Sequence, residues 1–391
     1  MNWDIASLFS DDTAEDRQFR AEVRDWVRDN APPELCHQRH RIAPPELKPW
    51  HHKLYERGWA APHWPKQYGG MGATLMQQII LFEEIVRVGA PTPYPHGLNF
   101  IGPIIIQAGT EEQKARFLPG ILSGDSTWCQ GYSEAGAGSD LASLQTRAVL
   151  DGDHFVVNGH KMWTTNGHYA DWMFALVRTD PEAKPRHAGI TMLLIDMKSP
   201  GLTVRPIQTL KGDSEFAEEF FDNVRVPKEN MLGGLNQGWR IAGMVLGGER
   251  FTTGHPRYAL VYLRQARQLA KQTGAWDDPG FRHRLTTLEI DLLGFLAYYR
   301  HAAKLHSAKA APVSMAPVIK IAGGTLAQRS ADLLMQAAGA QGPMIDDISL
   351  SGDAVNVASE LFEMRRVSVG SGTTEVNRTI ISKRVLELPD A

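Results

Sequence analysis

The stretch TRAVLDGDHFVVNGHKMWTTNG, residues 146–167, decides the fold class, because apolar and polar residues alternate along it and β-branched side chains are frequent. Asp151-Gly152 and Asn158-Gly159 are turn pairs that flank the alternating run, a pattern that predicts a β-hairpin. Four more strand-like segments follow within residues 171–227, with no helical pattern between them. We therefore expect an antiparallel, barrel-like sheet rather than repeated βαβ units.

Helical patterns occupy both sides of this β-rich region. Before it, helical segments alternate with loops rich in Pro and Gly, and Thr110 followed by Glu111 and Glu112 is a helix N-cap signal. From about residue 235 the helical period returns and continues to the end. The sequence thus predicts an α+β fold with an N-terminal helical domain (1–124), a middle antiparallel β-domain that is barrel-like (125–234) and a C-terminal helical bundle (235–391).

Composition excludes several classes of protein. The 391 residues include 41 Lys and Arg against 44 Asp and Glu, a formal net charge of −3, so the chain lacks the basic excess that nucleic-acid binding needs. No apolar run approaches the ~18 residues of a membrane span, and the acidic N-terminus resembles neither a secretory signal nor a transit peptide. The two Cys lie far apart, which fits a reducing compartment. We expect a cytoplasmic protein with neither a nucleic-acid nor a membrane partner.

The histidines predict no metal site. His37 and His40 could share a helix face, and His51 and His52 are adjacent in the chain. No carboxylate or Cys stands near them at the spacing of metal ligands. We therefore expect solvated surface histidines and no bound metal.

A glycine-rich segment, GYSEAGAGSD at 131–140, precedes the hairpin. It lacks the G-x-G-x-x-G spacing of a dinucleotide fingerprint, no Walker Lys follows it, and a strand stands where that fingerprint needs a helix. Its glycines, with Ser133 and Ser139, still allow backbone N–H groups to approach an anion or a ring. From spacing alone a tight turn between strands is favoured, and a ligand-binding loop is the alternative.

Four motifs together identify a family resemblance. They are YSEAGAGSD at 132–140, KMWTTNG at 161–167, QAAGAQG at 336–342 and GTTEVNR at 372–378. They resemble the signatures of the acyl-CoA dehydrogenases, in the family's order and over essentially the whole chain. The resemblance implies the helical, β and helical architecture, FAD, and α,β-desaturation of an acyl-CoA thioester in fatty acid metabolism and β-oxidation. It also implies a homotetramer that passes electrons to an electron-transferring flavoprotein.

Carried over residue by residue, the resemblance implies a set of FAD-binding positions. Ser133 is expected at the flavin ring edge, Trp163 beside the isoalloxazine and Thr165 near its N5 atom. Ser139 is expected at the pyrophosphate or the substrate. Gln336 and Gly339 are expected at the AMP half of a neighbouring subunit's FAD. The full set is Tyr132, Ser133, Gly138, Ser139, Trp163, Thr165, Gln336, Gly339, Thr373 and Glu375. Without the family, a core tryptophan and a strand-forming threonine would be favoured for Trp163 and Thr165.

Desaturation of a thioester needs a base for the α-proton, a hydride acceptor, and donors to the thioester oxygen. Many family members carry the base as a Glu directly before G-T-S, where this chain has Ser371, whose hydroxyl is too weakly basic. Isovaleryl-CoA and long-chain acyl-CoA dehydrogenases instead carry Glu before Arg on the first long helix after the β-domain, and Glu249-Arg250 matches that position. The resemblance thus implies that Glu249 is the base, that Ser371 acts through its backbone N–H, and that Arg250 orients the helix or the substrate. From the residues alone, a solvated Glu paired with a nearby Lys or Arg would be favoured.

Two departures from the family pattern keep alternatives open. The R-x-x-F-G motif, whose Arg meets FAD across a subunit interface, is absent from residues 270–279, and Ala340 replaces a usual Gly. Arg264, Arg267 or Lys271 could compensate, but spacing does not choose among them. One alternative is therefore a non-catalytic or partner-dependent subunit of a hetero-oligomeric acyl-CoA dehydrogenase. A second alternative is an acyl-CoA oxidase that uses O2.

Overall fold

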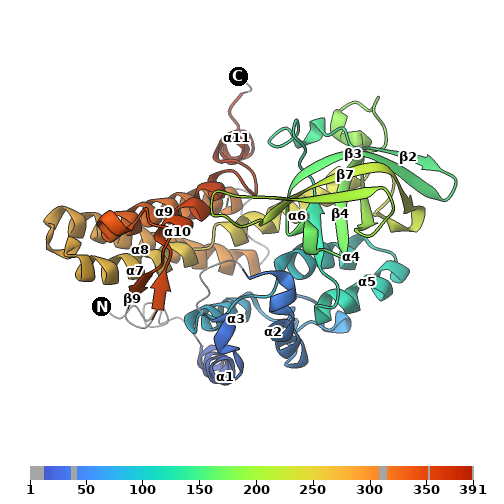
Figure 1. Cartoon of the computed structure of the whole chain (residues 1–391). Helices are drawn as coiled ribbons and strands as arrows, with labels where there is room; N and C mark the ends of the chain where they lie inside the picture. Colours follow the sequence, from blue (N-terminus) through green and yellow to red (C-terminus); the bar gives the residue numbers. More distant parts are fainter. Residues whose placement is uncertain (1–12, 37–41, 308–314, 351–352, 390–391) are drawn as a thin grey trace.

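The computed structural model describes residues 13–36, 42–307, 315–350 and 353–389. A strand-rich layer lies at one end of the molecule, a long helical bundle extends away from it, and the N-terminal helices lie beneath both (Figure 1). His37 and His40 lie outside the described residues.

The N-terminal part is helical, as predicted. Its helices are α1 (Ala14–Asn30), α2 (Pro44–Glu56), α3 (Leu75–Arg87), α4 (Gly102–Ala108) and α5 (Glu111–Ser123). Thr13, Thr74 and the predicted Thr110 each cap a helix, because the hydroxyl of each accepts a hydrogen bond from the third helical N–H.

His51, expected at the surface, is instead buried in this part of the chain. Its Nε2 lies 3.0 Å from the carbonyl oxygen of Leu122, and burial lowers the pKa of His51. The short-range pattern missed this because α5, which supplies Leu122, is distant in sequence. Within the described ranges, no group of three or more His, Cys, Asp or Glu side chains is arranged to hold a metal ion.

The middle part forms one sheet of eight strands within the described residues. They are β1 (Trp128–Gly131), β2 (Arg147–Asp151), β3 (His154–Thr165), β4 (Trp172–Arg178), β5 (Ile190–Asp196), β6 (Leu202–Ile207), β7 (Phe216–Pro227) and β8 (Met231–Leu232). The order is β6-β7-β3-β2-β4-β5-β8, and β1 pairs with β4. The predicted α+β class and strand-rich middle part are confirmed, although the sheet is open. It is also not purely antiparallel, because β1 and β2 each pair in parallel with β4.

Asp151-Gly152 forms the predicted turn between β2 and β3, but Asn158-Gly159 does not form one. It is a bulge inside β3, where the pairing with β7 shifts register between Val157 and Gly159. Gly159 has φ = 151°, and a Cβ atom there would lie 2.6 Å from Cα of Thr146. Turns and bulges draw on the same residue types, so local sequence did not separate them.

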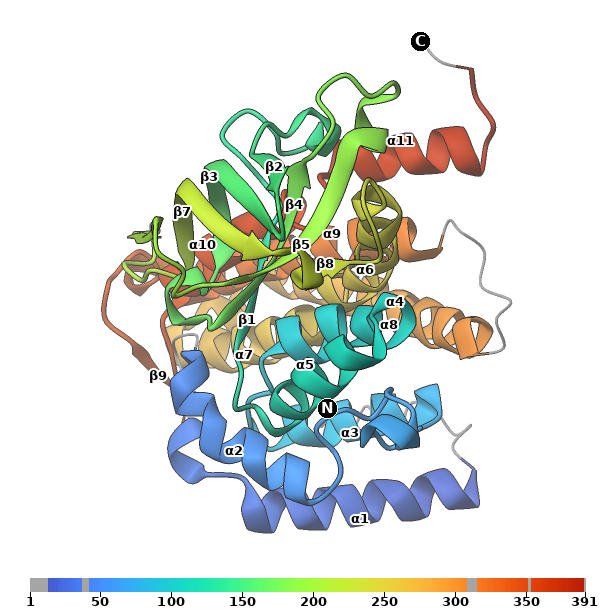
Figure 2. The ribbon, with the colours of Figure 1, turned by 90° about the vertical axis from the view of Figure 1, so that its right-hand side faces the viewer.

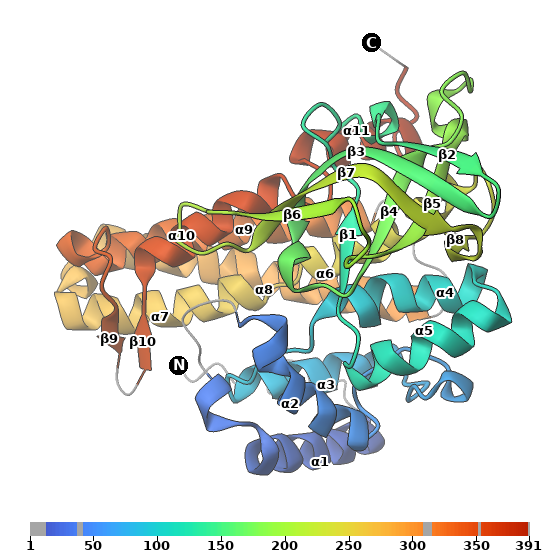
Figure 3. The ribbon, with the colours of Figure 1, turned by 45° about the vertical axis from the view of Figure 1, so that its right-hand side comes forward.

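The C-terminal part is the predicted helical bundle (Figures 2 and 3). Its helices are α6 (Gly238–Thr253), α7 (Arg257–Thr273), α8 (Pro279–Ser307), α9 (Met315–Ala338), α10 (Val357–Arg365) and α11 (Thr374–Arg384), with a hairpin of β9 (Ile348–Leu350) and β10 (Asp353–Val355). The end of α6 approaches α9 closely, because a Cβ atom on Gly323 would lie 2.1 Å from the Gly254 carbonyl oxygen. Among the residues that the structure describes, no helix has the length and apolarity needed to cross a membrane.

We predict that Gly159→Ala lowers the free energy of unfolding by about 1–3 kcal/mol, because the methyl group would meet the Thr146 backbone at a glycine-like φ. The matched control is Gly294→Ala, an exposed position of α8 where an added Cβ has open space. That control should raise stability by about 0.5–1 kcal/mol, because alanine favours the helix. Denaturant unfolding of the two variants measures both changes, and a gain in stability for Gly159→Ala would contradict the bulge.

Candidate active site

The glycine-rich segment forms a loop that leads from β1 across the start of β3. Glu134 and Ala137 exchange two backbone hydrogen bonds of 3.1 Å, and the carbonyl of Ser133 accepts a 3.0 Å bond from the N–H of Met162. Cβ atoms added at Gly136 and Gly138 would meet no atom within 4 Å, and Ser139 is exposed. The ends of the loop are thus held by hydrogen bonds, while its open rim at residues 136–139 leaves space for a ligand, as a ligand-binding loop requires.

A buried ion pair holds this loop on the sheet. Lys161, on β3, is completely buried, and its Nζ donates to the Tyr132 carbonyl at 3.0 Å and to Oε1 of Glu134 at 2.8 Å. Glu134 also accepts bonds from the backbone N–H groups of Gln145 and Thr146. Burial lowers the pKa of Lys161 to about 8, against the opposing effect of Glu134. Burial also opposes the charge of Glu134, but Lys161 outweighs it and lowers the pKa of that carboxyl.

Trp163 occupies a strained position next to the loop. It lies at a second bulge of β3, has φ = 63° and leaves 55% of its surface exposed. A large side chain at positive φ costs about 1–3 kcal/mol, and such strain concentrates at functional sites. Its ring contacts the edge of Phe216 at 6.0 Å between centroids. The bond from Met162 to Ser133 brings the predicted positions Ser133 and Trp163 together.

The two residues after Trp163 are held by hydrogen bonds to other segments. The carbonyl of Thr165 accepts a 2.9 Å bond from the hydroxyl of Tyr94, and the hydroxyl of Thr164 donates to Oε2 of Glu219 at 2.6 Å. Glu219 is completely buried, and burial raises its pKa to about 8. No sequence pattern indicates Glu219, because Glu218-Glu219 and Phe220-Phe221 interrupt the alternation that would assign each residue to one face of the strand.

Tyr132 differs in placement from the other predicted positions of the loop. Its ring is buried in the core, at 5.8 Å between centroids from the Phe174 ring. Its carbonyl is the acceptor for Lys161. The side chain therefore supports the loop from inside the sheet.

The C-terminal loop forms a second group of predicted residues. Ser371 has φ = 58° and is followed by Gly372 at φ = 82°, so two successive residues are left-handed. The hydroxyl of Thr373 caps α11 by accepting a 3.1 Å bond from the N–H of Val376, and Glu375 lies exposed in the first turn. The hydroxyl oxygens of Ser371 and Thr253 lie 2.8 Å apart.

Glu249 and Arg250 lie on α6, one turn before Thr253. Their side chains lie outside the part of the structure that is described. The contact between Thr253 and Ser371 therefore joins this helix to the C-terminal loop.

Gln336 and Gly339 lie apart from these residues, at the end of α9 that points away from the sheet (Figures 1 and 3). Gln336 lines a groove of about 340 Å³ between α8 and α9. Its walls are His283, Arg284, Thr287, Leu288, Arg329, Asp332 and Leu333. Within one chain the structure does not bring Gln336 together with Ser133, Trp163 or Ser371.

Two of the residues that could replace the missing arginine motif are engaged elsewhere. Arg267 forms an ion pair with Glu289, and both Arg267 and Lys271 lie over the ring of Trp276. The basic residues beside Gln336 are instead His283, Arg284 and Arg329. Sequence spacing missed them because α8 and α9 meet only in the packed bundle.

Comparison with known proteins agrees with this architecture. The family profiles of the acyl-CoA dehydrogenase N-terminal, middle and C-terminal domains match residues 13–125, 129–224 and 236–386. The chain is 35% identical to acyl-CoA dehydrogenase IpdE1 of Mycobacterium tuberculosis, over 95% of this chain and 97% of that protein. It is also 35% identical to acyl-CoA dehydrogenase FadE26 of that organism, over 85% of this chain and 86% of that protein.

Two solved structures share the fold over nearly the whole chain. One is described as the Tcur3481-Tcur3483 steroid ACAD, with a TM-score of 0.87, 30% identity, and coverage of 98% of this chain and 100% of that chain. The other is the ChsE4-ChsE5 complex from Mycobacterium tuberculosis, with a TM-score of 0.83, 31% identity, and coverage of 97% and 99%. The chain therefore belongs to the acyl-CoA dehydrogenase family of flavin-dependent oxidoreductases.

Proposed function

We propose that the chain binds FAD and that Glu249 removes the α-proton of an acyl-CoA thioester. The observation that carries this proposal is the contact between Thr253 and Ser371, which joins the helix of Glu249 to the loop expected to hold the thioester carbonyl. When bound, FAD supplies the acceptor for the β-hydride. A carboxylate suits the proton transfer, because exclusion of water raises the pKa of such a group toward neutrality.

Ser371 contributes its backbone N–H in this proposal. The left-handed conformation at Ser371 and Gly372 turns the chain sharply, and the Thr253 hydroxyl holds the Ser371 side chain. A fixed N–H that donates to the thioester oxygen stabilises the negative charge that develops there as the α-proton leaves. Arg250, next to Glu249, is proposed to orient the helix or the substrate.

The described residues fit a flavin. The exposed, strained Trp163 offers an aromatic face, and Ser133 is held beside it. The open rim at Gly138 and Ser139 leaves room for a pyrophosphate or for substrate. Thr165, Thr373 and Glu375 lie on the segments that follow Trp163 and Ser371, and we propose that they contact the same FAD.

The groove at Gln336 is proposed to receive the AMP half of FAD from a neighbouring subunit. Gln336 and Gly339 lie at and directly after the end of α9, which points away from the sheet (Figure 3), so they can serve a cofactor only where two chains share it. The groove also carries Arg284, whose guanidinium supplies positive charge where the arginine motif is missing. The groove therefore supports an oligomer as the active form.

We propose a bulky acyl group as the substrate and an electron-transferring flavoprotein as the acceptor, in the cytoplasm. The position of the proposed base, Glu249 on α6, resembles the position of the base in family members that act on branched, long or bulky acyl groups. The similar structure described as a steroid ACAD supports a large substrate. We also propose that the three domains of the chain are residues 1–124, 125–234 and 235–391.

We predict that Glu249→Gln retains FAD and binds acyl-CoA but slows anaerobic flavin reduction by about 10²- to 10⁴-fold, the usual contribution of a general base. Stopped-flow absorbance with a panel of acyl-CoAs measures the rate. The control is Glu229→Gln, an exposed carboxylate near the sheet, which should reduce at the unmodified rate. An unchanged rate in Glu249→Gln would remove Glu249 from the mechanism, and rapid hydrogen peroxide formation under air would favour the oxidase.

We predict that Ser371→Ala and Ser371→Gly each keep flavin reduction within about tenfold of the unmodified protein, because both retain the N–H and lose one hydrogen bond. Thr253→Val should match Ser371→Ala, since it removes the other half of the same contact. Single-turnover reduction measures all three. Loss of reduction in Ser371→Ala with FAD still bound would mean that the hydroxyl itself takes part in proton transfer.

A homotetramer is the proposed assembly, and a hetero-oligomer with a related subunit is the second candidate. The second is favoured by the engagement of Arg267 and Lys271 with Trp276, and by the similar ChsE4-ChsE5 complex. We predict that the chain produced alone forms a yellow tetramer, measured by native mass spectrometry and flavin absorbance. A colourless protein that takes up FAD only with an unlike subunit would establish the second candidate.

A further inference from the structure

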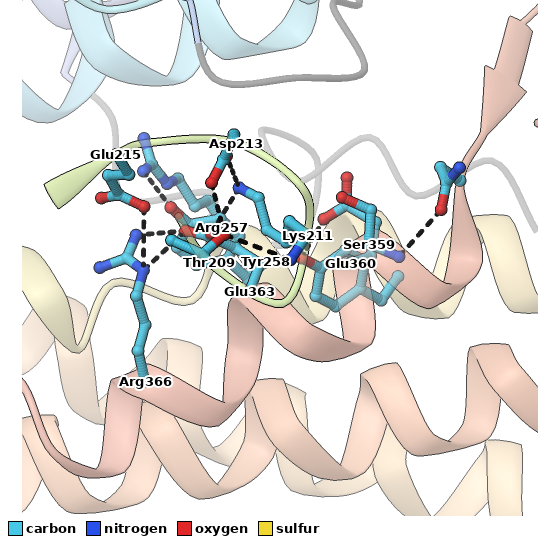
Figure 4. A network of polar contacts seen from close by, with 12 residues as sticks. Thr209, Lys211, Asp213, Glu215, Arg257, Tyr258, Ser359, Glu360, Glu363 and Arg366 are labelled. Atoms are coloured by element: carbon cyan, nitrogen blue, oxygen red, sulfur yellow. Dashed lines mark hydrogen bonds and ion pairs between the residues drawn. The ribbon is translucent and has the colours of Figure 1, made fainter. Parts of the chain in front are cut away.

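The loop between β6 and β7 carries an ion network that the function proposed above does not use. Thr209 closes the loop, because its hydroxyl donates to Oδ1 of Asp213 at 2.6 Å and its carbonyl accepts the N–H of Gly212 at 3.0 Å. This turn points Lys211 away from the sheet and across to α10 (Figure 4). The loop is thus a preformed support for one buried cation.

Lys211 joins the sheet to the bundle. Its Nζ lies 2.8 Å from Oε2 of Glu363 on α10 and 2.9 Å from Oδ2 of Asp213, and only 10% of its side chain is exposed. Arg366 forms a second ion pair with Glu363 and lies 3.7 Å from Oε2 of Glu215. Glu363 is therefore held between one cation from the sheet and one from the bundle.

The charges in this network persist over a wide pH range. Burial opposes the charge of Glu363, but Arg366 and Lys211 outweigh it and lower its pKa to about 2. Burial likewise opposes the charge of Lys211, but Glu363 and Asp213 raise its pKa above the ordinary value. Glu363 thus stays ionised down to low pH, and Lys211 stays charged through the neutral range.

Both ends of the network lead to the proposed flavin site. On the sheet side, the carbonyl of Glu215 accepts a 2.7 Å bond from the N–H of Asn166, and the next residue, Phe216, contacts the ring of Trp163. On the bundle side, Arg366 opens a short 3₁₀ helix that ends at Ser368, three residues before Ser371. Continuous contacts therefore run from Trp163 to the loop of Ser371.

We propose that Lys211 and Arg366 are positioning residues, which set the distance between the strand end at Trp163 and the loop at Ser371. This inference rests on the proposed function, because the distance matters only if the two segments hold one flavin and its thioester. Removing the charge of Lys211 leaves the carboxylates of Asp213 and Glu363 facing each other without the cation between them, so the loop and α10 should separate. A shift of about 1 Å between positioning elements can cost about 10²-fold in rate.

Lys211→Met tests the proposal, because it keeps the length of the side chain and removes its charge. The result expected is FAD binding that is about 10- to 100-fold weaker, an altered visible circular dichroism of bound flavin, and a lower kcat with a smaller change in KM. Lys211→Arg should restore most of the affinity, since it supplies a cation to the same carboxylates.

Arg20→Met is the matched control. Arg20 is also a buried cation that bridges two carboxylates, Glu83 and Glu84, but it lies in the N-terminal helices. It should lower stability as Lys211→Met does and leave FAD affinity and flavin circular dichroism unchanged. Wild-type FAD affinity and kcat in Lys211→Met would overturn the proposal, and so would equal losses of FAD affinity in both variants.

Hydrogen exchange of the protein without flavin separates this proposal from the proposed function. In Lys211→Met, exchange should rise at residues 163–167 and 366–373 together, and in Arg20→Met it should not. If the unmodified protein took up no FAD, the proposed function would fail while this coupling could still be observed. Unchanged exchange in Lys211→Met would overturn the coupling. If Lys211→Met does not fold, Glu363→Gln provides the same test, because it keeps the shape of the side chain and removes the charge that Lys211 and Arg366 share.

Discussion

The buried ion pair between Lys161 and Glu134 is the interaction on which the candidate site depends. It fixes the glycine-rich loop to β3 at the position where the strand bulges and exposes Trp163. A charge as deeply buried as Lys161 is tolerated only with a partner and further hydrogen bonds, and the Tyr132 carbonyl completes that set. These contacts of Lys161 therefore tie the loop to the strand beside the strained position of Trp163.

The site is built from segments that belong to different parts of the fold. The sheet contributes the glycine-rich loop and Trp163, and the bundle contributes α6 and the loop of Ser371. Within the bundle, the hydroxyl groups of Thr253 and Ser371 join α6 to the C-terminal loop. Between the sheet and the bundle, the ion network of Lys211, Glu363 and Arg366 makes the connection. The groove of Gln336 lies at the other end of the bundle, so the proposed cofactor-binding residues of one chain do not all lie in one place.

Local sequence patterns predicted the helices and strands, whereas the bulges and the buried ion pairs depend on packing between segments that are distant in the chain. Alternation around Asp151-Gly152 was enough to find the hairpin, because a turn is a short-range feature. The same reasoning misplaced Asn158-Gly159, because a bulge depends on the register of β7, which comes about 60 residues later in the chain. Motifs located Ser133, Trp163, Ser371 and Thr373 through the family resemblance, and all lie in loops or at bulges. Lys211 and Glu363, 152 residues apart, carry no shared pattern, so only the folded chain could reveal them.

In the proposed mechanism, the carboxylate of Glu249 exchanges a proton with the carbon next to the thioester carbonyl. The most direct measurement is deuterium incorporation at that carbon, followed by NMR in D2O, with an acyl-CoA whose β-carbon cannot release a hydride. We expect exchange in the unmodified protein, no exchange when Glu249 is replaced by Gln, and retained exchange when Ser371 is replaced by Ala. Undiminished exchange without the Glu249 carboxylate would contradict the proposed role of Glu249.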